Sequence, residues 1–214
     1  VLNVYNERLL RLLAETQIPK VFLDTSSLVS PDELNGDLLL MESRNSVRNI
    51  TAHLLEKGRT LPGFMGDIGY AQSNRERYEG FCQALMDAGK TPNPSLCLTT
   101  PLGIDSYREE IDSFLSSLSR MPDAFVCASD YVACILMQLL EKRGLRVPED
   151  VAVSGFDNNT EDLLAEHLTT VQVFNEELGS RLALQILYRI KYPHTPHEVT
   201  YLESKVLYRA STGD

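Results

Sequence analysis

Residues 147–171 read VPEDVAVSGFDNNTEDLLAEHLTTV, and the other segments of the chain can be placed around them. The helix predicted before them ends in basic residues and Gly144, as helix C-termini commonly do. Val151–Val153 is an apolar run typical of a strand that is covered on both faces of a parallel sheet. Asp157 follows at the carboxyl end of this strand, and residue 159 or 160 is expected to cap a further helix. Because ligands of open α/β sheets bind outside the carboxyl ends of strands, Asp157 is the first candidate binding residue.

The rest of the chain alternates between short apolar runs and amphipathic segments. Strands are predicted at 21–23, 38–41, 61–66, 95–99 and 124–127, and an extended segment at 198–208. Helices are predicted at 4–16, 43–58, 74–88, 105–118, 130–143 and 176–191. This order of elements is typical of parallel βαβ crossovers, and it predicts a doubly wound α/β fold with parallel sheets.

Composition indicates a globular chain without a nucleic-acid-binding surface of its own. The 214 residues are 43% hydrophobic and carry a net charge of −10, and they contain no basic cluster. No apolar run approaches the ~20 residues of a membrane span, so no span is expected. The four cysteines form no Cys-x-x-Cys pair, which favours free thiols and a cytoplasmic location. Since the chain opens Val1-Leu2-Asn3 without methionine, we expect a piece of a longer protein.

The sequence lacks the motifs of common enzyme classes. Gly89-Lys90-Thr91 resembles the end of a phosphate-binding loop, but Ala84 stands where that loop needs a glycine. Neither Gly-x-Ser-x-Gly nor His-Glu-x-x-His occurs. His194 and His197 stand in a proline-flanked loop that is poorer in ligands than known zinc sites. We therefore expect a protein that is not an enzyme, with no catalytic residue, no metal and no cofactor.

Two arginines at a helix start are unusual. Arg75 and Arg77 fall in the first turn, where the helix dipole favours acidic residues, so another group is expected to hold at least one of them. A salt bridge to a loop carboxylate and a hydrogen bond to ligand oxygens are both open. Ser73 and Glu76 have the spacing of a capping box, which favours a cap over a ligand contact for Ser73.

Polar residues also end two of the predicted strands. For Asp157 the alternatives are a helix cap and a carboxylate that accepts hydrogen bonds from two sugar hydroxyls. Ser129 and Asp130 follow the strand at 124–127, and Asp130 is the one expected to cap the next helix.

Five blocks of sequence together resemble the LacI/GalR family of bacterial transcriptional regulators in its effector-binding core. They are VPEDVAVSGFDN…LTTV, PDAFVCASD at 122–130, IPKVFLD at 18–24, RERYEGF at 75–81 and RAST at 209–212. The blocks keep the order and spacing of the family across essentially the whole chain. The resemblance implies a type I periplasmic-binding-protein architecture, in which a small effector, usually a sugar, lies between two doubly wound lobes.

The resemblance also implies a division of the chain between the two lobes. Residues 1–41 would be a partial N-terminal subdomain, 42–172 the C-terminal subdomain, 173–200 a return to the first and 201–214 a tail on the second. The first part of the N-terminal subdomain and the helix-turn-helix headpiece that reads operator DNA would both be missing. The acidic balance of the chain agrees with a missing DNA reader.

Carried over position by position, the resemblance implies six ligand-binding residues: Arg77, Asp157, Ser129, Ser73, Met41 and Asn175. Arg77 and Asp157 match the arginine and the carboxylate that grip effector hydroxyls. Ser129 stands where many members have asparagine, and Ser73 where a serine or similar group lines the cleft. Met41 and Asn175 stand where an aromatic residue often packs on the sugar, so both depart from the family pattern.

The favoured hypothesis is the effector-sensing core of a regulator, expected to be a cytoplasmic repressor. The resemblance implies a homodimer as partner state, a sugar or sugar derivative as effector, and operator DNA contacted only through the absent headpiece, without a membrane. The alternative is a sugar-binding protein of a transport system with the same fold, which a signal peptide in place of the headpiece would reveal. An α/β enzyme that uses Asp157 and Arg77 is a third hypothesis, but it lacks a nucleophile or cofactor motif.

Overall fold

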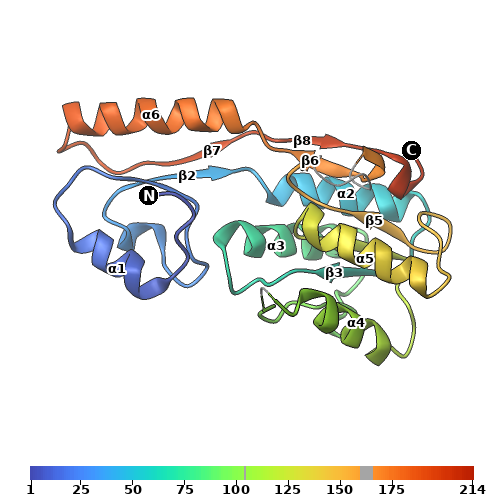
Figure 1. Cartoon of the computed structure of the whole chain (residues 1–214). Helices are drawn as coiled ribbons and strands as arrows, with labels where there is room; N and C mark the ends of the chain where they lie inside the picture. Colours follow the sequence, from blue (N-terminus) through green and yellow to red (C-terminus); the bar gives the residue numbers. More distant parts are fainter. Residues whose placement is uncertain (104, 160–165) are drawn as a thin grey trace.

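The computed structural model describes residues 1–103, 105–159 and 166–214, and these form two lobes that lie end to end (Figure 1). Each lobe has a three-stranded parallel sheet at its centre. This arrangement confirms the predicted α/β fold class with parallel sheets. The helix expected to begin near Glu161 lies outside the described residues.

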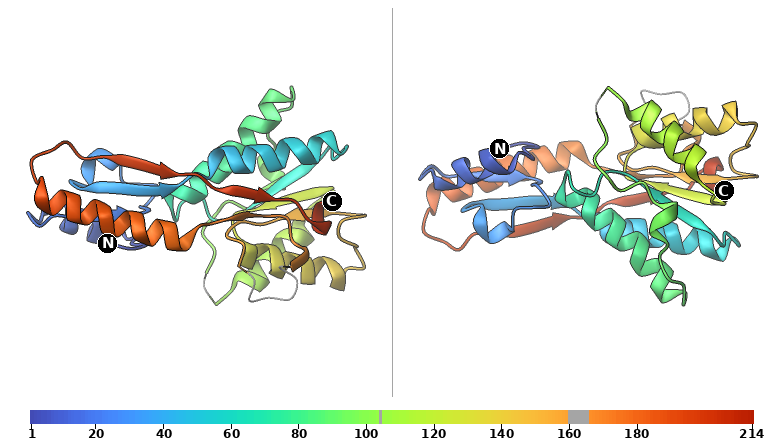
Figure 2. Two further views of the ribbon diagram at one scale, coloured as in Figure 1. Left: turned by 90° about the horizontal axis from the view of Figure 1, so that it is seen from above. Right: turned by 90° about the horizontal axis from the view of Figure 1, so that it is seen from below.

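The first lobe contains a sheet with the order β1-β2-β7 and two helices. Its elements are β1 (Val21–Leu23), β2 (Asp37–Met41), β7 (Val199–Leu202), α1 (Glu7–Glu15) and α6 (Asn175–Lys191), with a short 3-10 helix, η1, at Pro31–Glu33. The two helices cover opposite faces of the sheet (Figure 2). Side chains alternate along a strand, so Leu38 and Leu40 pack with Leu10 of α1, while Leu39 packs with Leu178 of α6.

The second lobe repeats this layered arrangement around the order β3-β4-β5. Its elements are β3 (Pro62–Met65), β4 (Ala124–Cys127), β5 (Ala152–Ser154), α2 (Arg44–Glu56), α3 (Gln72–Asp87), α4 (Tyr107–Ser117) and α5 (Asp130–Lys142). One face packs against α2 and α3 through Ile50 and Phe81, and the other against α4 and α5 through Ile111 and Leu136. The strands are apolar on both faces because both faces are covered.

The chain passes between the lobes three times (Figure 1). It leaves β2 for α2, returns from β6 (Thr170–Gln172) to α6, and leaves β7 for β8 (Lys205–Leu207), which pairs antiparallel with β6. A 3-10 helix, η4 (Ala210–Thr212), then ends the chain beside β5. We propose that the subdomain boundaries lie near 41/42, 172/173 and 200/201. The last of these falls inside β7.

Two local predictions were wrong. The strand expected at 95–99 is a 3-10 helix, η2 (Pro94–Leu96), followed by a single bridge from Leu98 to Met65. Proline at the first helical position and the Asn93 side chain, which accepts from the Ser95 amide at 3.1 Å, favour this turn over a strand. The cap of α4 is Ser106 instead of Asp105.

A buried ion pair fastens α6 to the first lobe. Arg189 of α6 and Asp37 at the start of β2 are 2% and 1% exposed, and the Arg189 Nε donates to Asp37 Oδ2 at 3.0 Å. Gln185 and the Glu198 amide donate to the same carboxylate at 2.9 Å each. Burial would raise the pKa of Asp37, but these hydrogen bonds and the guanidinium lower it. The helix therefore buries a polar stripe whose charges are fully paired.

Replacing Asp37 with alanine should lower the free energy of unfolding by about 3–5 kcal/mol, because Arg189 would keep a buried charge without its partner. Urea denaturation of the chain would measure this loss. The matched control is Glu7→Ala, which breaks the exposed Arg11–Glu7 pair on α1 and should leave the midpoint almost unchanged. Equal midpoints for Asp37→Ala and the control would contradict the structural role given to this pair.

Candidate functional site

Polar residues from both lobes meet at the carboxyl ends of their sheets. Asp24 follows β1 in the first lobe, and its Oδ2 accepts a hydrogen bond from the Ser73 hydroxyl of α3 in the second lobe at 2.6 Å. Beside it, the Gln72 amide donates to the Thr25 carbonyl at 2.8 Å. The junction is therefore held by hydrogen bonds from one lobe to the other.

Asp24 is held in an unusual backbone conformation. Its φ is +56°, in the left-handed region that is uncommon for residues other than glycine, although aspartate adopts it more often than most. The residue is 9% exposed, and its carboxylate accepts further hydrogen bonds from the Thr25 amide at 2.8 Å and the Tyr5 hydroxyl at 3.3 Å. Strain of this kind persists where the surroundings over-determine it, as they commonly do at binding sites.

Ser73 was predicted to cap a helix, and this was wrong. The N-cap of α3 is Ala71, and Ser73 lies inside the first turn, 8% exposed. Because its hydroxyl donates to Asp24, it serves the contact between lobes instead of the helix end. A capping box cannot be recognised from spacing alone when a carboxylate from a distant segment competes for the hydroxyl.

Arg77 brings a cation into this junction. Its side chain is 10% exposed, and the guanidinium carbon lies 3.6 Å from the centre of the Phe156 ring, as in a cation–π contact. Nη1 donates to the Ala128 carbonyl and, at 3.3 Å, to Asn74. The buried Nε has no partner among the described residues. Burial lowers the pKa of Arg77, and the neighbouring carboxylates, led by Asp157, oppose this effect.

Asp157 stands opposite Arg77. Its Oδ1 lies 3.8 Å from Arg77 Nη2, too far for a direct hydrogen bond but close enough for an ion pair. Its φ is +110°, and its side chain is 45% exposed. The surrounding protein raises the pKa of Asp157, although Arg77 lowers it. A strained, exposed carboxylate beside a buried guanidinium is well suited to accept hydrogen bonds from a ligand.

The prediction that Asp130 caps the helix was wrong, because Ser129 is the cap. Ser129 is the N-cap of α5 and accepts from the Val132 amide at 3.3 Å. Asp130, 2% exposed, points back to the sheet and accepts from the Thr170 hydroxyl at 2.6 Å and the Asn159 amide at 2.8 Å. Burial raises the pKa of Asp130 to about 6, against the effect of these hydrogen bonds.

Two of the candidate residues are not brought to this cluster. Met41 is 8% exposed and packs with Leu39 and Leu178 between β2 and α6. Asn175 is the first residue of α6 and is exposed. The structure thus groups Ser73, Arg77 and Asp157, with Ser129 at the next strand end.

Sequence reasoning missed Asp24 and two tyrosines. Tyr5 before α1 and Tyr70 before α3 bring aromatic rings from the two lobes to a centroid distance of 4.3 Å. Burial and the charge of Asp24 raise the pKa of Tyr5, so its hydroxyl remains a donor. Asp24 could have been found, because it ends a predicted strand just as Asp157 does. Nothing in the sequence pattern marked the tyrosines.

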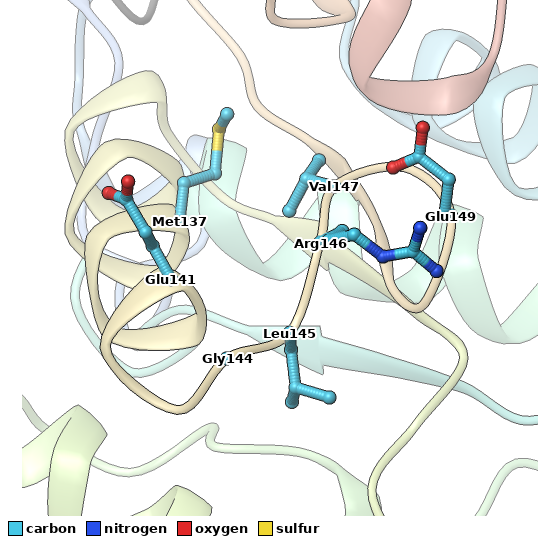
Figure 3. Close-up of a pocket in the computed structure, with 7 residues that line it drawn as sticks. All are labelled: Met137, Glu141, Gly144, Leu145, Arg146, Val147 and Glu149. Carbon is cyan, nitrogen blue, oxygen red and sulfur yellow. The ribbon is translucent and has the colours of Figure 1, made fainter.

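A separate hollow lies at the other end of α5 (Figure 3). Its volume is about 480 Å³, and its lining residues are Met137, Glu141, Gly144, Leu145, Arg146, Val147 and Glu149. None of the six candidate residues lines it. In the described part of the chain, no group of histidine, cysteine and carboxylate side chains could hold a metal ion, and no helix is long and apolar enough to cross a membrane.

The sequence of this chain is similar to those of known proteins. A family model described as periplasmic binding protein-like domain matches residues 51–212. The HTH-type transcriptional repressor PurR of Aliivibrio salmonicida is 29% identical over 209 residues, which are 96% of this chain and 61% of that protein. The chain therefore spans about three fifths of the length of this relative.

Solved structures have the same fold. The transcriptional regulator CelR in complex with cellobiose superposes with a TM-score of 0.86 at 27% identity, covering 99% of this chain and 64% of that one. A LacI family transcriptional regulator from Silicibacter pomeroyi gives a TM-score of 0.73 at 25% identity, covering 98% and 75% of the two chains.

Asp130 should make stability fall as the pH rises. Its pKa of about 6 in the folded chain lies above the usual 3.8, so between these values the folded state holds a proton that the unfolded state releases. The loss between pH 4 and pH 7 should be at most about 3 kcal/mol from this group. Urea denaturation of the wild type and Asp130→Asn across this range would measure it. An identical pH dependence in both proteins would contradict the assignment.

Proposed function

The chain belongs to the periplasmic binding protein-like domain family as an effector-binding core of the LacI/GalR type, and on this premise we propose that it binds a small sugar-like ligand between its lobes. The main support for this proposal is the environment of the Arg77 guanidinium. A guanidinium that is buried against Phe156, and whose Nη2 faces an exposed carboxylate without a direct hydrogen bond, is suited to contact a ligand oxygen.

The first lobe supplies the complementary half of the site. Asp24 lies near enough to raise the pKa of Arg77, and Tyr5 presents both a hydroxyl and a ring face. Carboxylates that accept from sugar hydroxyls, a guanidinium that donates to them, and an aromatic surface are the groups that orient a polyhydroxylated ligand. Ser73 and Ser129 would contribute hydroxyls at the edge, with Met41 and Asn175 more distant candidates.

Ligand binding would be coupled to the angle between the lobes. The two halves of the site sit on separate sheets, and three chain crossings join those sheets. A ligand that contacts Asp24 on one side and Arg77 with Asp157 on the other stabilises the arrangement in which these groups are close. Any segment that senses this angle then gains or loses its own affinity by linkage.

We propose that the sensed output is operator DNA binding. The relatives with matching sequences are named transcriptional repressors, and about two fifths of the PurR relative lies outside the match, so a DNA reader would belong to that part. The chain itself, with a net charge of −10, is unsuited to bind DNA electrostatically. A homodimer acting in the cytoplasm completes the proposal. The names of these relatives favour it over a transport protein.

Arg77→Ala and Asp157→Ala should abolish stabilisation by the effector. A ligand at about 100 times its Kd raises the free energy of unfolding by about 2.7 kcal/mol, which corresponds to several degrees in Tm. Thermal unfolding of the chain with a panel of sugars, including cellobiose and ribose, would identify such a ligand in the wild type. Both variants should then show no shift.

Arg75→Ala is the matched control, because Arg75 lies in the same helical turn as Arg77 but is only half-buried. It should keep the full ligand shift. A ligand shift that survives in Arg77→Ala and Asp157→Ala would place binding elsewhere and refute the proposed site.

A further inference from the structure

We infer that this site excludes anionic ligands, so that its effector is an uncharged polyhydroxylated molecule and carries no phosphate or carboxylate group. The inference rests on the proposed function, which leaves open whether the effector is a free sugar or a charged derivative. It comes from the charges that surround Arg77.

Among the residues that the structure describes, carboxylates outnumber cations at the junction. Three of them, Asp157, Asp24 and Asp130, act electrostatically on the Arg77 guanidinium. Among the described residues, Arg209 is a second cation near the cluster: it acts on Asp130, and its Nη1 and Nη2 donate to the Leu168 carbonyl and to Asn158 at 3.1 and 2.8 Å. Three carboxylates thus stand against two guanidinium groups. The charge of the cluster therefore remains negative.

Neutral donors satisfy two of these carboxylates without cancelling their charge. Asp24 accepts from hydroxyls of Ser73 and Tyr5, and Asp130 accepts from Thr170 and a backbone amide. Hydrogen bonds from such groups stabilise a carboxylate but leave its field in place, and low exposure limits screening by solvent.

Arg77 cannot offset this field for a second anion. Nη1 already donates to Ala128 and Asn74, and Nε is buried without access to solvent. The remaining nitrogen, Nη2, lies 3.8 Å from Asp157. A phosphate or carboxylate bound at Nη2 would lie within a few ångströms of that carboxylate, and like charges at this distance repel strongly in a partly buried site.

Hydroxyl groups fit the same positions without this repulsion. A sugar hydroxyl donates to Asp24 or Asp157 and accepts from Nη2, so each charged group gains a partner of the right kind. The Tyr5 and Tyr70 rings, tilted by 44° with their centroids 4.3 Å apart, offer an uncharged surface beside these groups. The site therefore matches neutral sugars and rejects their phosphate esters.

Thermal unfolding of the chain with matched pairs tests the inference: glucose against glucose 6-phosphate, and ribose against ribose 5-phosphate, at constant ionic strength. The neutral member of a binding pair should bind at least about tenfold more tightly than its ester, a difference of about 1.4 kcal/mol. A tighter ester would overturn the inference and leave the sugar site itself intact.

Inorganic phosphate provides a probe that does not depend on which sugar binds. Replacing chloride by phosphate at constant ionic strength should raise the Tm of the wild type no more than that of Arg77→Ala. A phosphate shift that requires Arg77 would overturn the inference. A lack of such a shift, combined with no response to any sugar, would refute the proposed function but uphold the exclusion of anions.

Asp130→Asn tests the electrostatic cause, because Asp130 acts on Arg77 but is turned toward Thr170. This variant should narrow the affinity ratio between sugar and ester several-fold. The control Asp32→Asn makes the same change in η1, on the exposed surface of the first lobe, and should keep the ratio. Equal ratios in Asp130→Asn and the control would contradict the role given to the acidic surroundings.

Discussion

The burial of the Arg77 charge at the junction of the two lobes is the constraint around which the candidate site is arranged. A buried guanidinium is costly unless aromatic, carbonyl and carboxylate groups replace its water. The second lobe supplies the Phe156 ring, the Ala128 carbonyl and Asp157, while Asp24 adds its charge from the first lobe. Because Asp24 belongs to the other lobe, its electrostatic effect on Arg77 depends on how the two lobes are placed relative to each other.

Strained backbone at the ends of strands presents the two carboxylates. Asp24 and Asp157 both have positive φ, and both follow short buried strands, one in each lobe. Each strand is held by parallel partners and by helices on both faces, and this rigid support sustains the strain. Each lobe thus presents one carboxylate from a residue of positive φ that follows a strand.

The fold class and the place of Asp157 after a strand could be predicted from the sequence, because buried parallel strands and amphipathic helices leave strong periodic signals. Val151–Val153 and the residues after it located Asp157 correctly at a strand end. The predictions failed where a distant segment decided the outcome. Ser73 donates to Asp24 from another lobe, and Asp130 turns to Thr170, which is forty residues away. Spacing along one helix contains no information about such partners, so the sequence did not point to Asp24 as part of the candidate site.

The most direct test is a crystal structure of the chain with whichever sugar raises its melting temperature. We expect ligand hydroxyls within about 2.6–3.2 Å of the Asp24 carboxylate on one side and of Arg77 Nη2 and Asp157 on the other, with both lobes in contact with one molecule. A ligand bound within a single lobe, or in the hollow at the end of α5, would contradict it.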